Sequence, residues 1–169
     1  MDDELHDLFV QLPPTVILEI YLDTSHGGAS LRAADLLMDR RPKYLPPPTV
    51  EGFRDLEYRR ARPAHQKLLE KGLSHHILWT ACKDTQTAAD ALLGGSWHGA
   101  FTWHFCREAR ASGNHLSRAK VLAKVRADLG AGHFTQVPQL DCEAVTRHAV
   151  LKAAEVPPSL APLPTEMPS

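Results

Sequence analysis

The sequence is short of cysteine and carries almost no net charge. Its three cysteines, Cys82, Cys106 and Cys142, form no CxxC pair, which argues against a zinc knuckle and against a disulfide framework. Lys and Arg number 19 against 20 for Asp and Glu, so charge does not predict a nucleic-acid partner. No apolar run approaches the roughly 20 residues that cross a bilayer, and no secretory signal opens the sequence. These absences predict a cytoplasmic protein without a membrane or nucleic-acid partner.

What the 169 residues do contain is enough apolar material for one core, with a hydrophobic fraction of 43%. Two segments, 16–22 and 75–82, have the length and the β-branched or aromatic content of buried strands. Each is followed by a polar loop, at 23–28 and at 82–87. Since ligands bind outside the carboxyl ends of strands in α/β sheets, we expect an α/β fold with its chemistry in these two loops.

The rest of the chain is expected to contain helices, a short extended piece at 135–140 and two proline-rich segments. Residues 38–52 are basic and rich in proline, which predicts an exposed loop, either a solvated connector or a processing loop cut after Arg40, Arg41 or Lys43. The proline-rich tail at 146–169 is expected to be disordered, which leaves one domain over 1–145. Helices are predicted over residues 1–12, 54–71, 88–93, 99–111 and 120–129, the last with Ser117 as its N-cap and Gly130 at its end.

Four segments in order resemble the caspase and metacaspase peptidases. They are YLDTSHGG at 21–28, ILWTACKDTQTAAD at 77–90, GSWHGAFT at 95–102 and FTQVPQL at 134–140. The resemblance implies a caspase-like three-layer α/β/α sandwich with a mostly parallel sheet. It also implies cysteine-type endopeptidase activity on polypeptide substrates, in which a thiolate attacks the scissile carbonyl and a histidine serves as base.

Two departures from the family pattern concern catalysis. The nucleophile position holds Ser25 instead of cysteine, either as a natural loss or as an engineered change. The family histidine lies about 50 residues before the nucleophile, whereas only 24 residues precede Ser25 here. That histidine is therefore expected to be absent, and the first strands of the sheet with it.

These departures predict that this chain is a relative of the proteases without protease activity, in other words a pseudoenzyme. The alternative is a non-catalytic caspase-fold module that binds or masks a protein partner. In either case the strand at 16–22 would keep an uncovered edge, which favours self-association.

Acidic residues follow both predicted strands and suit a basic substrate side chain. Asp23 and Asp84 at neighbouring strand ends could hold Arg or Lys by charge-assisted hydrogen bonds, and the resemblance agrees. Their simpler roles would be a loop cap and an Asx-turn. The resemblance places His26 and Gly27 in the loop around the oxyanion site.

Other candidates are weaker. His98 is expected to start a helix, and Cys82 to be a small buried thiol at a strand end instead of a nucleophile. No cofactor or metal site is predicted, because no dense acidic cluster is visible. Calcium enters only by analogy with some metacaspases.

Overall fold

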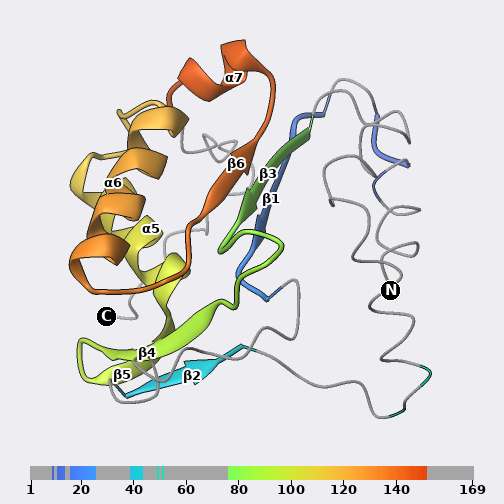
Figure 1. Ribbon diagram of the computed structural model, residues 1–169. Helices are drawn as coiled ribbons and strands as arrows, with labels where there is room; N and C mark the ends of the chain where they lie inside the picture. The colour runs from blue at the N-terminus through green and yellow to red at the C-terminus, as the bar shows by residue number, and fades with distance from the viewer. Residues whose placement is uncertain are drawn as a thin grey trace, which may run out of the picture.

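The computed structural model describes residues 9, 11–13, 16–25, 39–43, 49, 51 and 76–151 (Figure 1). Predictions for residues 54–71, for nearly all of 1–12 and for the tail beyond 151 lie outside these residues. The elements in chain order are β1 (Leu18–Leu22), β2 (Arg40–Pro42), β3 (His76–Thr80), β4 (Ala89–Leu93), β5 (Ser96–Gly99), α5 (Ala100–Ala111), α6 (Arg118–Ala131), β6 (Gln139–Asp141) and α7 (Ala144–His148).

The first sheet, sheet A, has the strand order β1-β3-β6. β1 is parallel to β3, with Leu18 opposite His76 and Leu22 opposite Thr80. β6 is antiparallel on the other side of β3. Both strands predicted at 16–22 and 75–82 are therefore confirmed, and β3 is the central one. β1 is less enclosed than its composition predicts, since Ile17 just before it is 72% exposed.

The second sheet, sheet B, is antiparallel in the order β2-β4-β5 and lies at the end of sheet A toward which β1 runs (Figure 1). β4 corrects the helical turn expected over 88–93. Its side chains alternate as a strand requires, with Ala89 and Ala91 buried and Leu92 half-exposed. The turn from β4 to β5 uses Gly94 and Gly95 at φ of 60° and 87°, which only glycine adopts easily.

β2 corrects the expectation of an irregular exposed loop over 38–52. Arg40 is buried because its guanidinium donates to the carbonyl oxygens of Gly132 and His133 and lies 3.9 Å from the centre of the Phe134 ring. Pro42 is tolerated because the N–H of the next residue, Lys43, donates to the carbonyl oxygen of Ala88, directly before β4. Hydrogen-bonded positions alternate along an antiparallel pair, so the proline nitrogen faces away from β4.

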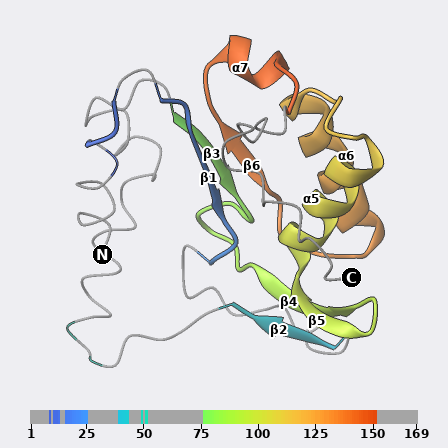
Figure 2. The same cartoon turned by 180° about the vertical axis from the view of Figure 1, so that it is seen from behind.

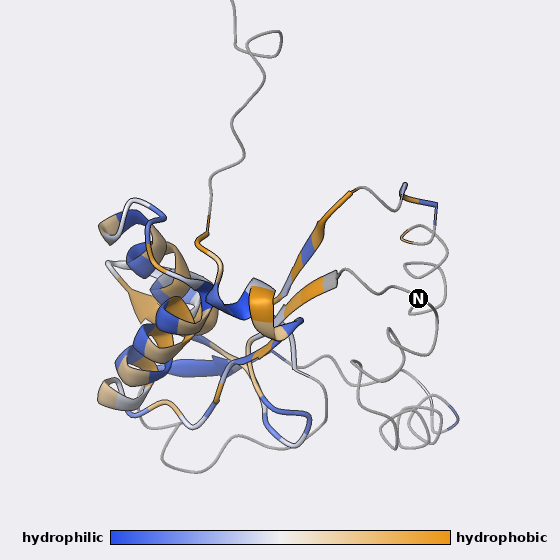
Figure 3. Cartoon of the chain, turned by 90° about the horizontal axis from the view of Figure 1, so that it is seen from above, coloured by the Kyte–Doolittle hydropathy of each residue, from blue (hydrophilic) through white to orange (hydrophobic). Residues whose placement is uncertain are grey.

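Helices α5 and α6 pack side by side on one face of sheet A (Figures 1 and 2). The prediction of a second helical layer falls on residues outside the described part of the chain. β1 and β3 are mostly hydrophobic in Figure 3, as the core requires. The fully buried core side chains from sheet and helices include Ile77, Trp79, Phe101, Val121, Val125 and Leu129.

The helix ends agree with the sequence in part. The Ser117 hydroxyl accepts from the Lys120 N–H at 3.3 Å, which confirms the predicted N-cap. α6 continues past Gly130 to Ala131. α7 spans the domain boundary predicted at residue 145, and Leu151 beyond it is 7% exposed, so packed structure continues past that boundary. Among the described residues, no helix is long and apolar enough to cross a membrane.

His104 on α5 is a buried imidazole whose two ring nitrogens have no hydrogen-bond partner in the described part of the chain. Burial lowers the pKa of His104 below 6.5, Arg107 lowers it further, and Asp128 and Glu108 oppose the shift. The unfolded chain therefore binds a proton that the folded chain does not, so stability falls as pH drops below 6.5.

We expect His104→Leu to raise the free energy of unfolding by about 1 kcal/mol at neutral pH, because an apolar side chain needs no partner there. The free energy of unfolding of the variant should also depend much less on pH between about pH 5 and 7. Asp and Glu side chains stay ionised in this range and contribute little to that dependence. Urea unfolding at both pH values measures this. A parallel pH dependence in both proteins would contradict it.

Candidate active site

The site forms where the carboxyl end of β1 meets sheet B and the start of α5. Asp23 and Ser25 follow β1, Lys43 follows β2, Ala88 directly precedes β4, and Asp90 is the second residue of β4. The predicted location after the first strand is therefore where several segments converge. The second predicted location, the loop after β3, supplies none of the residues named here for the site.

The Ser25 hydroxyl hydrogen-bonds to the backbone of Ala88. The Ala88 N–H donates to Ser25 Oγ at 2.9 Å, and Oγ lies 3.5 Å from the Ala88 carbonyl oxygen, to which it can donate. Within the described residues, no imidazole hydrogen-bonds this hydroxyl. The described contacts of the Ser25 hydroxyl therefore hold the loop against the backbone of Ala88.

Asp23 binds the start of α5 and a lysine. Its Oδ2 accepts from Thr102 Oγ1 at 2.6 Å and from the Thr102 N–H at 3.3 Å. Gly99, the N-cap residue, makes no side-chain cap, so Asp23 supplies an acceptor and a negative charge at the helix start. The simpler role foreseen for Asp23, a cap, is thus present together with an ion pair.

Lys43 is the cation of the site. Its Nζ lies 3.0 Å from Asp23 Oδ2 and 3.2 Å from Asp90 Oδ1, and it donates to the Asp23 carbonyl oxygen at 3.2 Å. Gly99 lies against both charged groups, and a Cβ there would collide with Asp23 Oδ2 and Lys43 Nζ. The chain therefore has glycine where the two charged groups need room.

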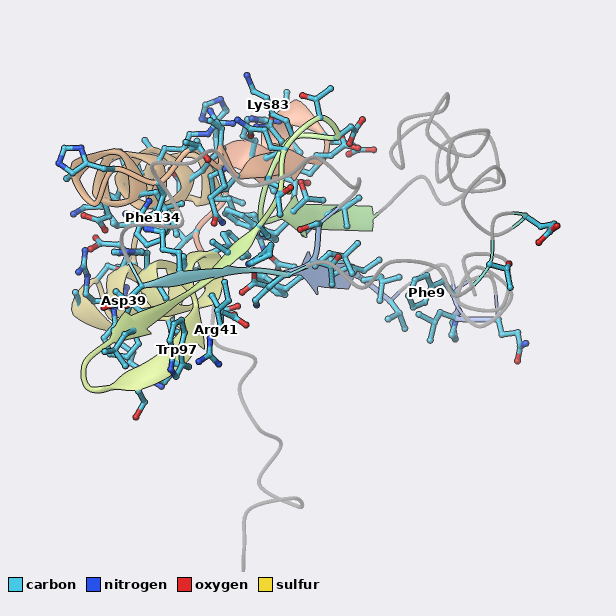
Figure 4. All side chains as sticks on the ribbon, turned by 60° about the horizontal axis from the view of Figure 1, so that its bottom comes forward. Phe9, Asp39, Arg41, Lys83, Trp97 and Phe134 are labelled. Atoms are coloured by element: carbon cyan, nitrogen blue, oxygen red, sulfur yellow. The ribbon has the colours of Figure 1, made fainter. Side chains whose placement is uncertain are left out.

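The remaining predicted site residues lie apart from this cluster or outside the described residues. Asp84 sits in an exposed turn closed by the Gln86 N–H and the Lys83 carbonyl, and no described hydrogen bond or ion pair joins it to Asp23. His26 and Gly27 lie outside the described residues. Arg41 stacks its guanidinium 3.9 Å from the centre of the Trp97 ring, as the labelled side chains in Figure 4 show.

Two weaker candidates have structural roles. Cys82 is fully buried, with its thiol 3.2 Å from the Gln86 carbonyl oxygen. His98 lies in β5 instead of starting the helix, and its ring is 4.6 Å from that of Trp103. The described residues hold no group of three or more His, Cys, Asp or Glu that could bind a metal ion.

Sequence reasoning overlooked Asp90 and Thr102. Both belong to the motifs quoted above, yet neither follows the end of a predicted strand. The strand-end argument therefore predicted Asp84 as the second carboxylate. The signal was available in the two-residue alternation of β4, which places Asp90 on the face opposite the buried Ala89 and Ala91.

Two glutamines hold the surrounding loops together. The buried Gln136 amide accepts from the Ala89 N–H and donates to the Ala81 carbonyl oxygen, both at 3.0 Å. Gln86 Oε1 accepts from the backbone N–H groups of Lys83 and Val137. These bonds tie the end of β3 to the start of β4 and fix the edge on which Ser25 rests.

The chain is similar to known caspases and metacaspases. The caspase domain family matches residues 1–150. Metacaspase-1B of Neosartorya fischeri is 28% identical over 93% of the chain and 44% of its own length. Metacaspase-1B of Aspergillus fumigatus is 26% identical over 84% of the chain and 41% of its own length. The chain thus spans less than half of these relatives. From the family match over most of its length, together with the α/β fold, the chain belongs to the caspase domain family.

Proposed function

We propose that this chain carries the nucleophile position and the basic-residue site of a cysteine-type endopeptidase domain directed at Arg or Lys, with serine in place of the catalytic cysteine. The observation that carries the proposal is the Asp23 carboxylate holding the Lys43 ammonium at 3.0 Å, two residues before Ser25. Because the Lys43 ammonium already binds the Asp23 carboxylate, the lysine or arginine of a substrate could form the same ion pair. Asp84 stays a prediction as a second carboxylate.

As it stands, the chain is proposed to be inactive. A hydroxyl is far less acidic than a thiol, and Ser25 has no described base within hydrogen-bond reach. The engaged hydroxyl and the lysine in the site also favour a second candidate, a caspase-fold module that binds a basic peptide without cutting it. Both candidates share the cation site and differ at position 25.

A direct test introduces a thiol at position 25 and measures whether a reagent with a basic side chain reacts faster with it than a neutral reagent does. In Ser25→Cys, a peptidyl chloromethyl ketone forms a thioether with the new thiol and releases chloride. We expect the lysyl ketone to label that position about tenfold faster than the norleucyl ketone, because only lysine pairs with Asp23. Labelling is followed by mass spectrometry, with Cys106 and Cys142 as internal references.

Two further variants make the test specific. Asp23→Asn in the Ser25→Cys background should remove the preference for lysine. Asp84→Asn in the same background decides whether that carboxylate takes part. Equal labelling by both ketones would refute a basic-residue site next to position 25, and labelling without hydrolysis of a lysyl reporter peptide would favour the binding module.

A further inference from the structure

We infer that Asp23 and Asp90 together form the site for a basic side chain, and that Lys43, the residue directly after β2, is its built-in occupant, which an incoming peptide must displace. The inference deepens the proposed function and rests on it for the identity of the ligand. It assigns a role to Asp90, and it makes Lys43 a competitor of substrate.

The first argument is the position of the ammonium group. Lys43 Nζ lies between two carboxylates from different parts of the chain, 3.0 Å from Asp23 and 3.2 Å from Asp90. Its side chain is 21% exposed, and that of Asp23 is 14% exposed. Opposite charges in partly dehydrated surroundings attract more strongly than in water. Removing the lysine would leave the two carboxylates without this cation.

The second argument is the backbone that brings Lys43 there. β2 pairs antiparallel with β4, with Arg41 opposite Asp90, and the pairing extends to a bond from the Lys43 N–H to the Ala88 carbonyl oxygen at 2.9 Å. Ala88 is the residue whose N–H binds Ser25 Oγ. An extended segment ending in a basic residue is thus bound along a strand edge beside the nucleophile position, which is how a peptide adds to a sheet.

The third argument is that the two ends of β2 are held differently. Arg40 is buried and fixed to the backbone of the 132–133 turn and to the Phe134 ring. Lys43 is held at the other end of a three-residue edge strand, largely through contacts that another ammonium or guanidinium group could make. An external peptide therefore needs to release Lys43 while Arg40 keeps the strand attached.

The test measures binding without any chemistry at Ser25. The probe is fluorescently labelled acetyl-Arg-Arg-Pro-Lys-amide, followed by anisotropy, with a norleucine-ended peptide for comparison. If the open site is populated at a few per cent in the wild type, Lys43→Met should bind the lysine peptide roughly 10- to 100-fold more tightly. Lys120→Met, which removes an exposed lysine from α6, should bind as the wild type does.

Asp90→Asn in the Lys43→Met background should weaken binding of the lysine peptide by roughly two- to fivefold and leave the norleucine peptide unchanged. Equal affinity of wild type and Lys43→Met for the lysine peptide would overturn the role of Lys43 as occupant. An unchanged affinity in Asp90→Asn would overturn the role of Asp90.

A measurement on the unaltered protein covers the case in which Lys43→Met does not fold. Amine-reactive labelling read by mass spectrometry should modify Lys43 more slowly than Lys120, and saturating lysine peptide should speed up the reaction at Lys43. Equal rates without peptide would overturn the inference. Because Ser25 takes no part in these assays, the displacement can succeed even if lysine-guided labelling of Ser25→Cys fails, and the two failures are distinguishable.

Discussion

Arg118→Met is expected to lower the free energy of unfolding by about 3–5 kcal/mol, the largest effect of any single change considered. Arg118 is bound to Glu19 by two hydrogen bonds, from Nε to Oε1 at 3.0 Å and from a terminal nitrogen to Oε2 at 2.8 Å. Trp79 Nε1 donates to the same Glu19 Oε1 at 2.8 Å. Without the guanidinium, the Glu19 carboxylate is left beside the core without its cation, bound by the neutral side chains of Trp79 and Tyr21.

The pH dependence of this loss follows from Glu19. Burial raises the pKa of Glu19, but hydrogen bonds from Arg118 and Trp79 outweigh it and lower the pKa below 4.5. The stabilisation is therefore present above pH 4.5 and is lost as pH falls through the lower, folded-state value. We expect the gap between wild type and Arg118→Met to narrow in acid.

Urea unfolding gives both measurements. Arg110→Met removes an exposed arginine from the last turn of α5 and should cost less than about 0.5 kcal/mol. Adding Glu19→Gln to Arg118→Met should recover part of the loss, because the amide carries no charge and still accepts from Trp79. An Arg118→Met protein as stable as Arg110→Met would show that the ion pair adds nothing.

Gln136→Leu is expected to cost about 2–4 kcal/mol, because it leaves the buried Ala89 N–H and Ala81 carbonyl without their partner. The two groups lie at the start of β4 and the end of β3, so the substitution also loosens the edge that carries Ser25 and Lys43. Amine labelling of Lys43 should accelerate in this variant even under conditions where it remains folded.

Gln139→Leu provides the matched control for Gln136→Leu. Among the described residues, the Gln139 amide donates to the carbonyl oxygens of Val137 and Pro138 in its own segment, so its loss should cost within about 1 kcal/mol. Circular dichroism and urea unfolding compare the pair. Similar losses in both variants would mean that the link between β3 and β4 through Gln136 is not specific.

The elements predicted correctly from sequence are those whose own residues determine their burial. β3 is an apolar run flanked by polar residues, and α6 combines a serine cap with a buried face of Val121, Val125 and Leu129. Local composition was sufficient in these cases, since the period and the cap both lie within the segment.

β2 and β4 were mispredicted because tertiary contacts decide them. Arg40 and Pro42 favour an exposed loop until acceptors from residues 132–133 and the edge of β4 are in place. β4 contains two alanines and two leucines, which are good helix formers, and becomes a strand only by pairing on both sides. Asp90 could not be predicted for the same reason, because its position near Asp23 depends on the pairing of β4.

The strand order of sheet A also dictates when this chain can fold during its own synthesis. β3 takes its parallel partner from upstream, with Leu18 opposite His76, and its antiparallel partner from downstream, with Leu78 opposite Asp141. The hairpin of β4 and β5 closes locally as soon as it is made, whereas sheet A waits until residue 141 has left the ribosome. Pairing over such separations is slow, and β3 keeps one edge open until β6 has been made, so that edge is exposed to wrong pairing until late in translation.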